Sequence, residues 1–164
     1  MTRPRSIPDA DIFAAILHVM TTDGEKSVAF STIARMTGLA APSLVQRYGG
    51  LQTMVRSALL WEWDRLDALA KTAIAELTAA DKSPQALLKA LTPGPTAALL
   101  AASQRAAALR DRAALWRSTV EHALAAKLGT PAAALLFAAW QGQALWQTNA
   151  DKGFKLKDAI KRLG

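Results

Sequence analysis

The stretch from Phe30 to Tyr48 reads F-S-T-I-A-R-M-T-G-L-A-A-P-S-L-V-Q-R-Y. Its first half repeats apolar residues at helical spacing and ends at Gly38, where a left-handed residue suits the end of a helix. Pro42 fits the first turn of a second helix, because the N–H that proline lacks would have no partner there. In that second helix Leu44 and Tyr48 lie four residues apart on one face. A helix, a glycine turn and a second helix with a polar outer face predict a helix-turn-helix, which places its second helix in the DNA major groove.

A longer segment, from Pro8 to Met54, resembles the DNA-binding domain of the TetR family of transcriptional regulators. The resemblance depends on three features: a first helix Ile12-Phe13-Ala14-Ala15-Ile16-Leu17, the signature Ile33-Ala34-Arg35-Met36-Thr37-Gly38-Leu39, and Leu44 with Tyr48 in the recognition helix. It implies an all-α fold with an N-terminal helix-turn-helix head of three helices, followed by a helical body that binds a ligand and forms a dimer. The expected domains are residues 1–50 and 51–164.

Three positions depart from the family pattern. Ala40 stands where the family usually has a Ser or Thr cap, and Val45 stands where it usually has Tyr. Leu51, after Gly49-Gly50, stands where a Lys usually grips a phosphate. We therefore keep two readings: a DNA-binding regulator of TetR type, and a helical ligand-binding or protein-interaction module whose DNA binding is weakened or lost.

The predicted DNA contacts come from both helices of the motif. Glutamine can read adenine and arginine can read guanine or hold a phosphate, so the polar face of the second helix is expected to face the major groove. The start of the first helix is expected to face phosphates. The predicted DNA-binding residues are Ser31, Thr32, Ala41, Pro42, Ser43, Gln46, Arg47 and Tyr48. An N-terminal arm with Arg3 and Arg5 either enters a minor groove or remains a solvated terminus.

Composition sets broader bounds. A net charge of +7 is compatible with a polyanionic partner, although much of it comes from the C-terminal segment that begins at Lys152. The chain has no cysteine, which excludes disulfides and thiolate chemistry. The longest apolar run, Ala132 to Trp140, is too short to span a membrane, and no secretory signal is evident after Met1. These features favour a cytoplasmic protein that is not a membrane protein.

The remaining pattern is helical throughout, and about nine helices are expected. No strand-like alternation occurs. Beyond the head the expected helices are about Leu51–Ala80, Pro84–Leu91, Thr96–Leu128 with an interruption near Leu109–Arg112, Ala132–Asn149 and Phe154–Leu163.

Catalysis finds little support in the sequence. The two histidines, His18 and His122, are far apart, and none of the common nucleophile, zinc-protease or phosphate-loop motifs is present. Neither an enzyme nor a metal or cofactor site is expected.

The body contains five tryptophans, which is unusual for its size. They either fill the core or border a pocket for a small, mainly apolar or aromatic effector, with a few polar groups to orient it. The resemblance implies that such an effector releases the regulator, a repressor, from its operator. The residues predicted to line this pocket are Trp61, Trp63, Gln104, Trp116, His122, Phe137, Trp140 and Gln141.

A stripe of residues along the helix after Pro131 predicts the dimer interface. Gly142 lies at its centre, and a glycine inside a helix usually has a packing reason, such as the close approach of another helix. That helix belongs either to a second copy, as the resemblance implies, or to the same chain. The predicted homodimer interface consists of Leu135, Ala138, Gly142, Leu145 and Asn149.

Overall fold

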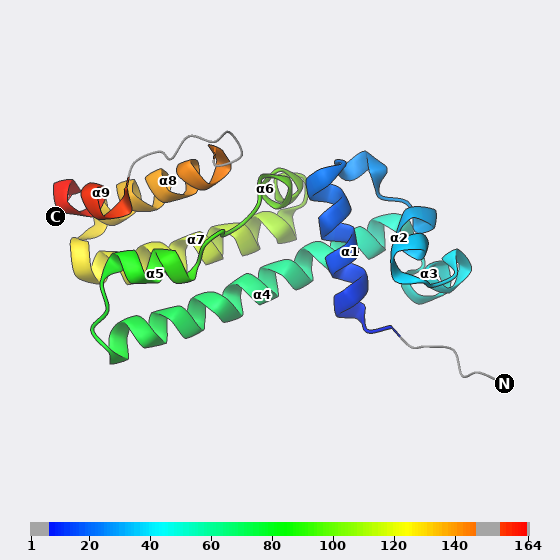
Figure 1. The fold of residues 1–164 in the computed structure, drawn as a ribbon, viewed down its shortest axis with the longest axis horizontal. Coiled ribbons are helices and arrows are strands. Elements are labelled where there is room, and N and C mark those ends of the chain that lie inside the picture. Colours follow the sequence, from blue (N-terminus) through cyan, green and yellow to red (C-terminus); the bar gives the residue numbers. More distant parts are fainter. Residues whose placement is uncertain (1–6, 147–154, 164) are drawn as a thin grey trace.

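The computed structural model describes residues 7–146 and 155–163 of the 164-residue chain. Every regular element in this described part is a helix, so the predicted all-α fold is confirmed. In chain order the elements are α1 (Asp9–Thr22), the 3-10 helix η1 (Glu25–Ser27), α2 (Phe30–Thr37), α3 (Ala41–Tyr48), α4 (Leu51–Ala79), α5 (Pro84–Ala90), α6 (Ala97–Ser103), α7 (Ala107–Leu128), α8 (Thr130–Trp146) and α9 (Leu156–Leu163) (Figure 1).

Helices α1, α2 and α3 form a head at one end of an elongated molecule (Figure 1). Gly38 ends α2 with a φ of 72°, a left-handed conformation that glycine adopts without steric cost. Ile33 from α2, Leu44 from α3 and Met54 from α4 are fully buried in the core cluster. Helix α2 packs against α3, and α3 packs against the start of the chain's longest helix, α4.

Helix α4 joins this head to the rest of the molecule. It runs without interruption from Leu51 to Ala79, and it packs against α1 in the head and against α7 in the body (Figure 1). Its buried side chains include Ala58 near the head and Leu66 further along. An apolar surface on more than one side is what two separate packing partners require.

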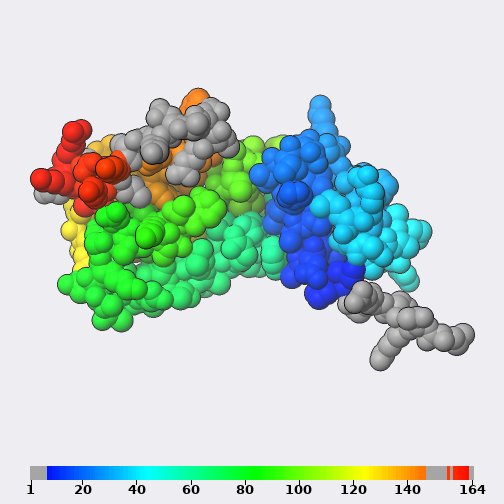
Figure 2. All heavy atoms as spheres, viewed as in Figure 1, coloured from blue at the N-terminus to red at the C-terminus, as the bar shows by residue number. Residues whose placement is uncertain are grey.

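The body is built around α7 and α8, which pack against each other after the chain reverses at Gly129. Helix α6 packs on α7, α5 on α4, and α9 on both α5 and α8. Figure 2 shows the blue-to-cyan head as a separate mass beside the green-to-red body. Among the helices of the described residues, each is too short or too polar to cross a bilayer.

The helix break predicted near Leu109–Arg112 lies elsewhere, between α6 and α7. The chain breaks earlier, because Ala106 is extended (φ −135°, ψ 126°) between α6 and α7. Alanine and arginine are both good helix formers, so local propensity gives no signal for this break. Tertiary packing decides it, since Ala102 before the break and Leu109 after it are both buried. The sequence also gave no indication of η1.

Candidate nucleic-acid interface

The exposed face of α3 carries polar side chains together with Pro42 and Val45. Ser43 and Gln46 are exposed, whereas Leu44 is buried and holds the helix in the head. Pro42 lies in the first turn and is exposed, and Val45 is 43% exposed. A helix that buries its apolar edge and turns its polar edge outward has the arrangement that reading the major groove requires.

The first turn of α2 supplies the predicted phosphate contacts. Ser31 is exposed there, and Thr32 is half-buried. The first N–H groups of a helix have no partner inside the helix, so this end of α2 suits the negative charge of a phosphate. Ala41 is half-buried at the start of α3. Ala40, the residue before it, provides no side-chain cap for that helix.

Arg47, in the last turn of α3, is held by the start of α1. Its Nη2 lies 3.0 Å from Oδ1 of Asp9, and its Nη1 donates a hydrogen bond of 2.8 Å to the carbonyl oxygen of Ile7. The guanidinium therefore joins the recognition helix to the first helix of the head. To contact a base, Arg47 has to exchange these partners for DNA.

Tyr48 also connects α3 to α1. Its hydroxyl donates a hydrogen bond to the carboxylate of Asp9, and its ring centroid lies 6.0 Å from that of Phe13. Burial raises the pKa of Tyr48, and the hydrogen bond to Asp9 raises it further. The phenol therefore remains a protonated donor, and the structure gives this residue a positioning role inside the head.

Asp9 is the residue that the sequence analysis missed at this interface. The sequence places it in the first turn of a helix, where an acidic residue suits the helix dipole. Its two partners on α3 are about forty residues away, and helical periodicity relates only residues within a few positions of each other. No signal in a single sequence reveals this pairing. The predicted arm with Arg3 and Arg5 lies outside the described residues.

Four of the eight predicted pocket residues come together in the body. Trp116 is at the centre: its ring centroid lies 6.1 Å from that of Trp63, 6.0 Å from Phe137 and 6.3 Å from Trp140. All four side chains are buried. We call these four residues the aromatic cluster.

Hydrogen bonds fix two indoles of the aromatic cluster. Nε1 of Trp63 donates to Oγ of the buried Ser103 at 3.0 Å, and Nε1 of Trp116 donates to the carbonyl oxygen of Leu66 at 3.2 Å. A buried indole N–H that has a partner avoids the cost of an unsatisfied donor. The cluster therefore links α4, α6, α7 and α8.

The other four predicted pocket residues are dispersed. The ring of Trp61 lies 6.0 Å from that of Phe13, on the head side of α4. Gln104 and His122 are exposed, and Nδ1 of His122 lies 2.9 Å from the carbonyl oxygen of Ser118 on its own helix. Gln141 donates a hydrogen bond of 3.2 Å to the carbonyl oxygen of Pro95, while its own buried side-chain oxygen has no hydrogen-bond partner among the described residues.

The predicted dimer stripe is open to solvent in the single chain. Leu135 is 59% exposed, Leu145 is 41% exposed and Ala138 is exposed. Gly142 is half-buried, and a Cβ added there would meet no atom within 4 Å beyond the backbone of its own helix. Asn149 lies outside the described residues. Trp146, one turn beyond Gly142, is 73% exposed, so α8 presents an apolar face that the described residues leave open.

Nowhere in residues 7–146 and 155–163 do three or more histidine, aspartate or glutamate side chains form a group that could hold an ion.

Comparison with known proteins identifies the fold. No model of a protein family and no curated protein matches the chain. The multidrug-binding protein EbrR, solved in complex with malachite green, superposes with a TM-score of 0.67 at 22% identity over 96% of both chains. SCO7518 of Streptomyces coelicolor A3(2), a candidate transcriptional regulator, superposes with a TM-score of 0.64 at 20% identity, over 93% of this chain and 94% of its own. The predicted TetR-like fold, a helix-turn-helix head on a helical body, is thereby confirmed.

Proposed function

We propose that this protein is a DNA-binding transcriptional regulator of TetR type that acts as a repressor and is not an enzyme. The observation that carries the proposal is the exposed polar face of α3, presented by a helix-turn-helix head on a fold that transcriptional regulators share. The proposal places the protein in the cytoplasm with the DNA that it reads.

In this proposal α3 enters the major groove. Ser43 and Gln46 face base edges, with Ala41 and Pro42 in close contact, while Ser31 and Thr32 face phosphates. Arg47 joins them when DNA phosphates or a guanine replace Asp9 as its partner. Tyr48 supports the interface from behind by holding α3 against α1.

Two copies of the head are needed to read a palindromic operator. The half-sites of such operators lie about 34–36 Å apart, or multiples of that distance, so the two heads need a fixed spacing. We propose that the stripe on α8 supplies the two-fold contact, because Leu135 and Leu145 are large apolar side chains that the single chain leaves exposed. A twofold interface uses the same patch on both subunits, which suits one continuous stripe.

The proposed signal for release is a small, mainly apolar effector. Support comes from EbrR, which shares the fold and was solved with malachite green. Support also comes from the aromatic cluster, because Trp116 contacts Trp63 and Leu66 of α4, the helix that packs on both the head and the body. An effector weakens DNA binding only if it binds the released arrangement more tightly than the DNA-competent one.

A second candidate function has a specific observation in its favour. The recognition helix lacks a side-chain cap at Ala40, and its Arg47 is engaged with Asp9. Leu51, the first residue of α4, stands at the usual position of a phosphate-binding Lys. These features favour a helical ligand-binding or protein-interaction module with weakened DNA binding.

Selection of bound fragments from genomic DNA tests the proposal directly. We expect one palindromic sequence to be enriched, and we expect its affinity to fall steeply as salt rises because phosphate contacts release counterions. Enrichment of no sequence, together with equal weak binding to all DNA at low salt, would favour the second candidate.

A further inference from the structure

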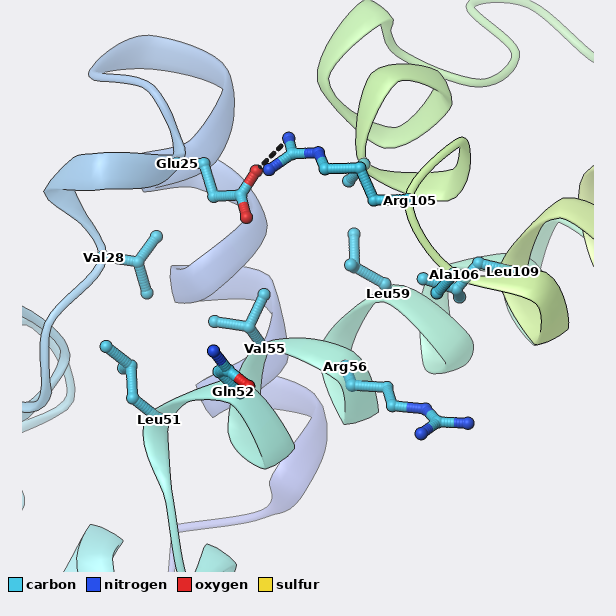
Figure 3. Close-up of a pocket in the computed structure, with 11 residues that line it drawn as sticks. Glu25, Val28, Leu51, Gln52, Val55, Arg56, Leu59, Arg105, Ala106 and Leu109 are labelled. Atoms are coloured by element: carbon cyan, nitrogen blue, oxygen red, sulfur yellow. Dashed lines mark hydrogen bonds and ion pairs between the residues drawn. The ribbon is translucent and has the colours of Figure 1, made fainter.

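A groove lies where the head meets the body (Figure 3). Its volume is about 310 Å³, at the lower end of the range for small-molecule sites. Val28 from the head, Val55 and Leu59 from α4, and Ala106 and Leu109 from the body provide an apolar lining. Three parts of the molecule that are distant in sequence therefore meet around one space.

Charged groups lie at the rim of this groove. The guanidinium of Arg105, just after α6, pairs with the carboxylate of Glu25 in η1, and this ion pair connects body to head (Figure 3). Arg56 lines the groove from α4, is exposed, and has no ion-pair partner among the described residues. The rim thus carries two arginines and one glutamate, an excess of one positive charge.

We propose that this head–body groove binds an amphiphilic monoanion, a molecule with one carboxylate and a short apolar chain or ring. The apolar part lies against Val55, Leu59 and Leu109, where it loses its contact with water. The carboxylate pairs with Arg105, whose planar guanidinium matches a carboxylate with two parallel hydrogen bonds. This site is separate from the aromatic cluster, because none of the four rings lines the groove.

The occupant competes with Glu25 for Arg105. When the ligand carboxylate takes this guanidinium, the ion pair between η1 and the end of α6 opens and the head is released from one of its contacts with the body. This consequence rests on the proposed function, since it affects transcription only if the head binds DNA. Binding of the ligand itself does not depend on that function.

Calorimetry with octanoate, 1-octanol and octylammonium, which share an apolar chain and differ in charge, tests the site without DNA. We expect octanoate to bind at least about threefold more tightly than 1-octanol, and octylammonium to bind most weakly, as expected for one exposed charge pair. Equal affinity for octanoate and 1-octanol would show that the groove has no preference for a carboxylate and would overturn the proposal. Tightest binding by octylammonium would show that the groove prefers a cation, which also contradicts it.

Two charge variants are expected to change the affinity for octanoate in opposite directions. Arg105→Gln should weaken octanoate binding by about two- to fivefold, and Glu25→Gln should strengthen it by a similar factor because it removes the competing carboxylate. A merely structural role of the ion pair would make both variants change binding in the same direction, and that result would overturn the proposal. Thermal unfolding followed by circular dichroism shows whether each variant is folded.

Two alanine-to-tryptophan variants test where the ligand binds. Ala106→Trp places a large side chain in the groove and should abolish octanoate binding. Ala108→Trp, at an exposed position outside the lining, is the matched control and should bind as the unchanged protein does. Unchanged binding by Ala106→Trp would place the ligand elsewhere. A separate assay then asks whether octanoate weakens DNA binding, so a failure of the regulatory function is distinguishable from a failure of the site.

Discussion

Asp9 and Arg47 form an ion pair of 3.0 Å that joins the first turn of α1 to the last turn of the recognition helix. The carboxylate of Asp9 also accepts the hydroxyl of Tyr48, so one acidic group holds two neighbouring residues of α3. The orientation of α3 within the head depends on this contact as well as on the buried Leu44.

Removing the guanidinium tests whether Arg47 contacts DNA. Arg47→Ala should weaken operator binding by about 1–3 kcal/mol and reduce the salt dependence, because a cation leaves the interface. Asp9→Asn should strengthen binding relative to the unchanged protein, because it removes the carboxylate that pairs with Arg47 and leaves only the hydrogen bond to the Ile7 carbonyl to be exchanged. Fluorescence anisotropy with a labelled operator at several salt concentrations measures both effects.

Lys89→Ala provides the control for that experiment. Lys89 is an exposed cation on α5 in the body, so its loss changes net charge by the same amount away from the head. If Arg47→Ala and Lys89→Ala bind the operator equally, Arg47 does not contact DNA and only positions α3.

The α8 stripe predicts how the protein assembles. Gly142→Arg should produce monomers and abolish tight operator binding, because an arginine on a close helix contact brings two copies of the same charge together. A Cβ added at Gly142 has no atom beyond its own helix backbone within 4 Å, so the start of the new side chain has space and the protomer should remain folded. Light scattering measures the mass in solution.

Ala75→Arg is the matched control, since Ala75 is an exposed alanine on α4 outside the stripe. A Gly142→Arg variant that has the mass of a dimer would place the interface on another surface.

The aromatic cluster predicts a strong contrast between two tryptophans. Trp116→Ala should lower the free energy of unfolding by about 3–5 kcal/mol, because it removes the central ring of a buried cluster and leaves a cavity. Trp146→Ala should change the stability of the monomer by less than about 0.5 kcal/mol, because that ring is 73% exposed. Urea denaturation of the Gly142→Arg background, in which Trp146 is not covered by a partner, measures both. Similar losses for the two variants would contradict the packing described here.

The effector proposal predicts that two signals change together. A neutral apolar aromatic compound should change tryptophan fluorescence and weaken operator binding over the same concentration range, because both report one binding event. Trp140→Phe, which keeps a ring in the aromatic cluster but removes the indole N–H, should reduce both responses. A compound that weakens operator binding with no fluorescence change would place the effector site away from the tryptophans.

Much of the fold follows from local sequence signals. Gly38 marked the turn of the motif and Pro84 marked the start of α5, because each residue type restricts the backbone in a way that sequence alone reveals. The break before α7 has no such marker, since alanine and arginine continue a helix as readily as they flank its end. There, the burial of Leu109 and Ala102 decides where the chain turns.

The candidate sites were predictable only in part. The outward position of Ser43 and Gln46 followed from the helical period, which also placed Leu44 inside. The partners of Arg47 did not follow, because they depend on where a distant helix lies in space. We predicted from their residue types that eight polar and aromatic side chains line one pocket, but the structure separates them. Trp61 contacts Phe13 of the head, whereas Trp63, two residues later, lies in the aromatic cluster.

The unbroken course of α4 has a mechanical consequence. At a rise of about 1.5 Å per residue, a helix of 29 residues is roughly 43 Å long. A tilt of about 5° around the body end of a rigid helix of this length carries its head end through roughly 4 Å. A displacement of that size is comparable to the rise of one base pair, about 3.4 Å. The proposed dimer would then lose its operator through a small rotation of each arm, with no unfolding and no large rearrangement of the body.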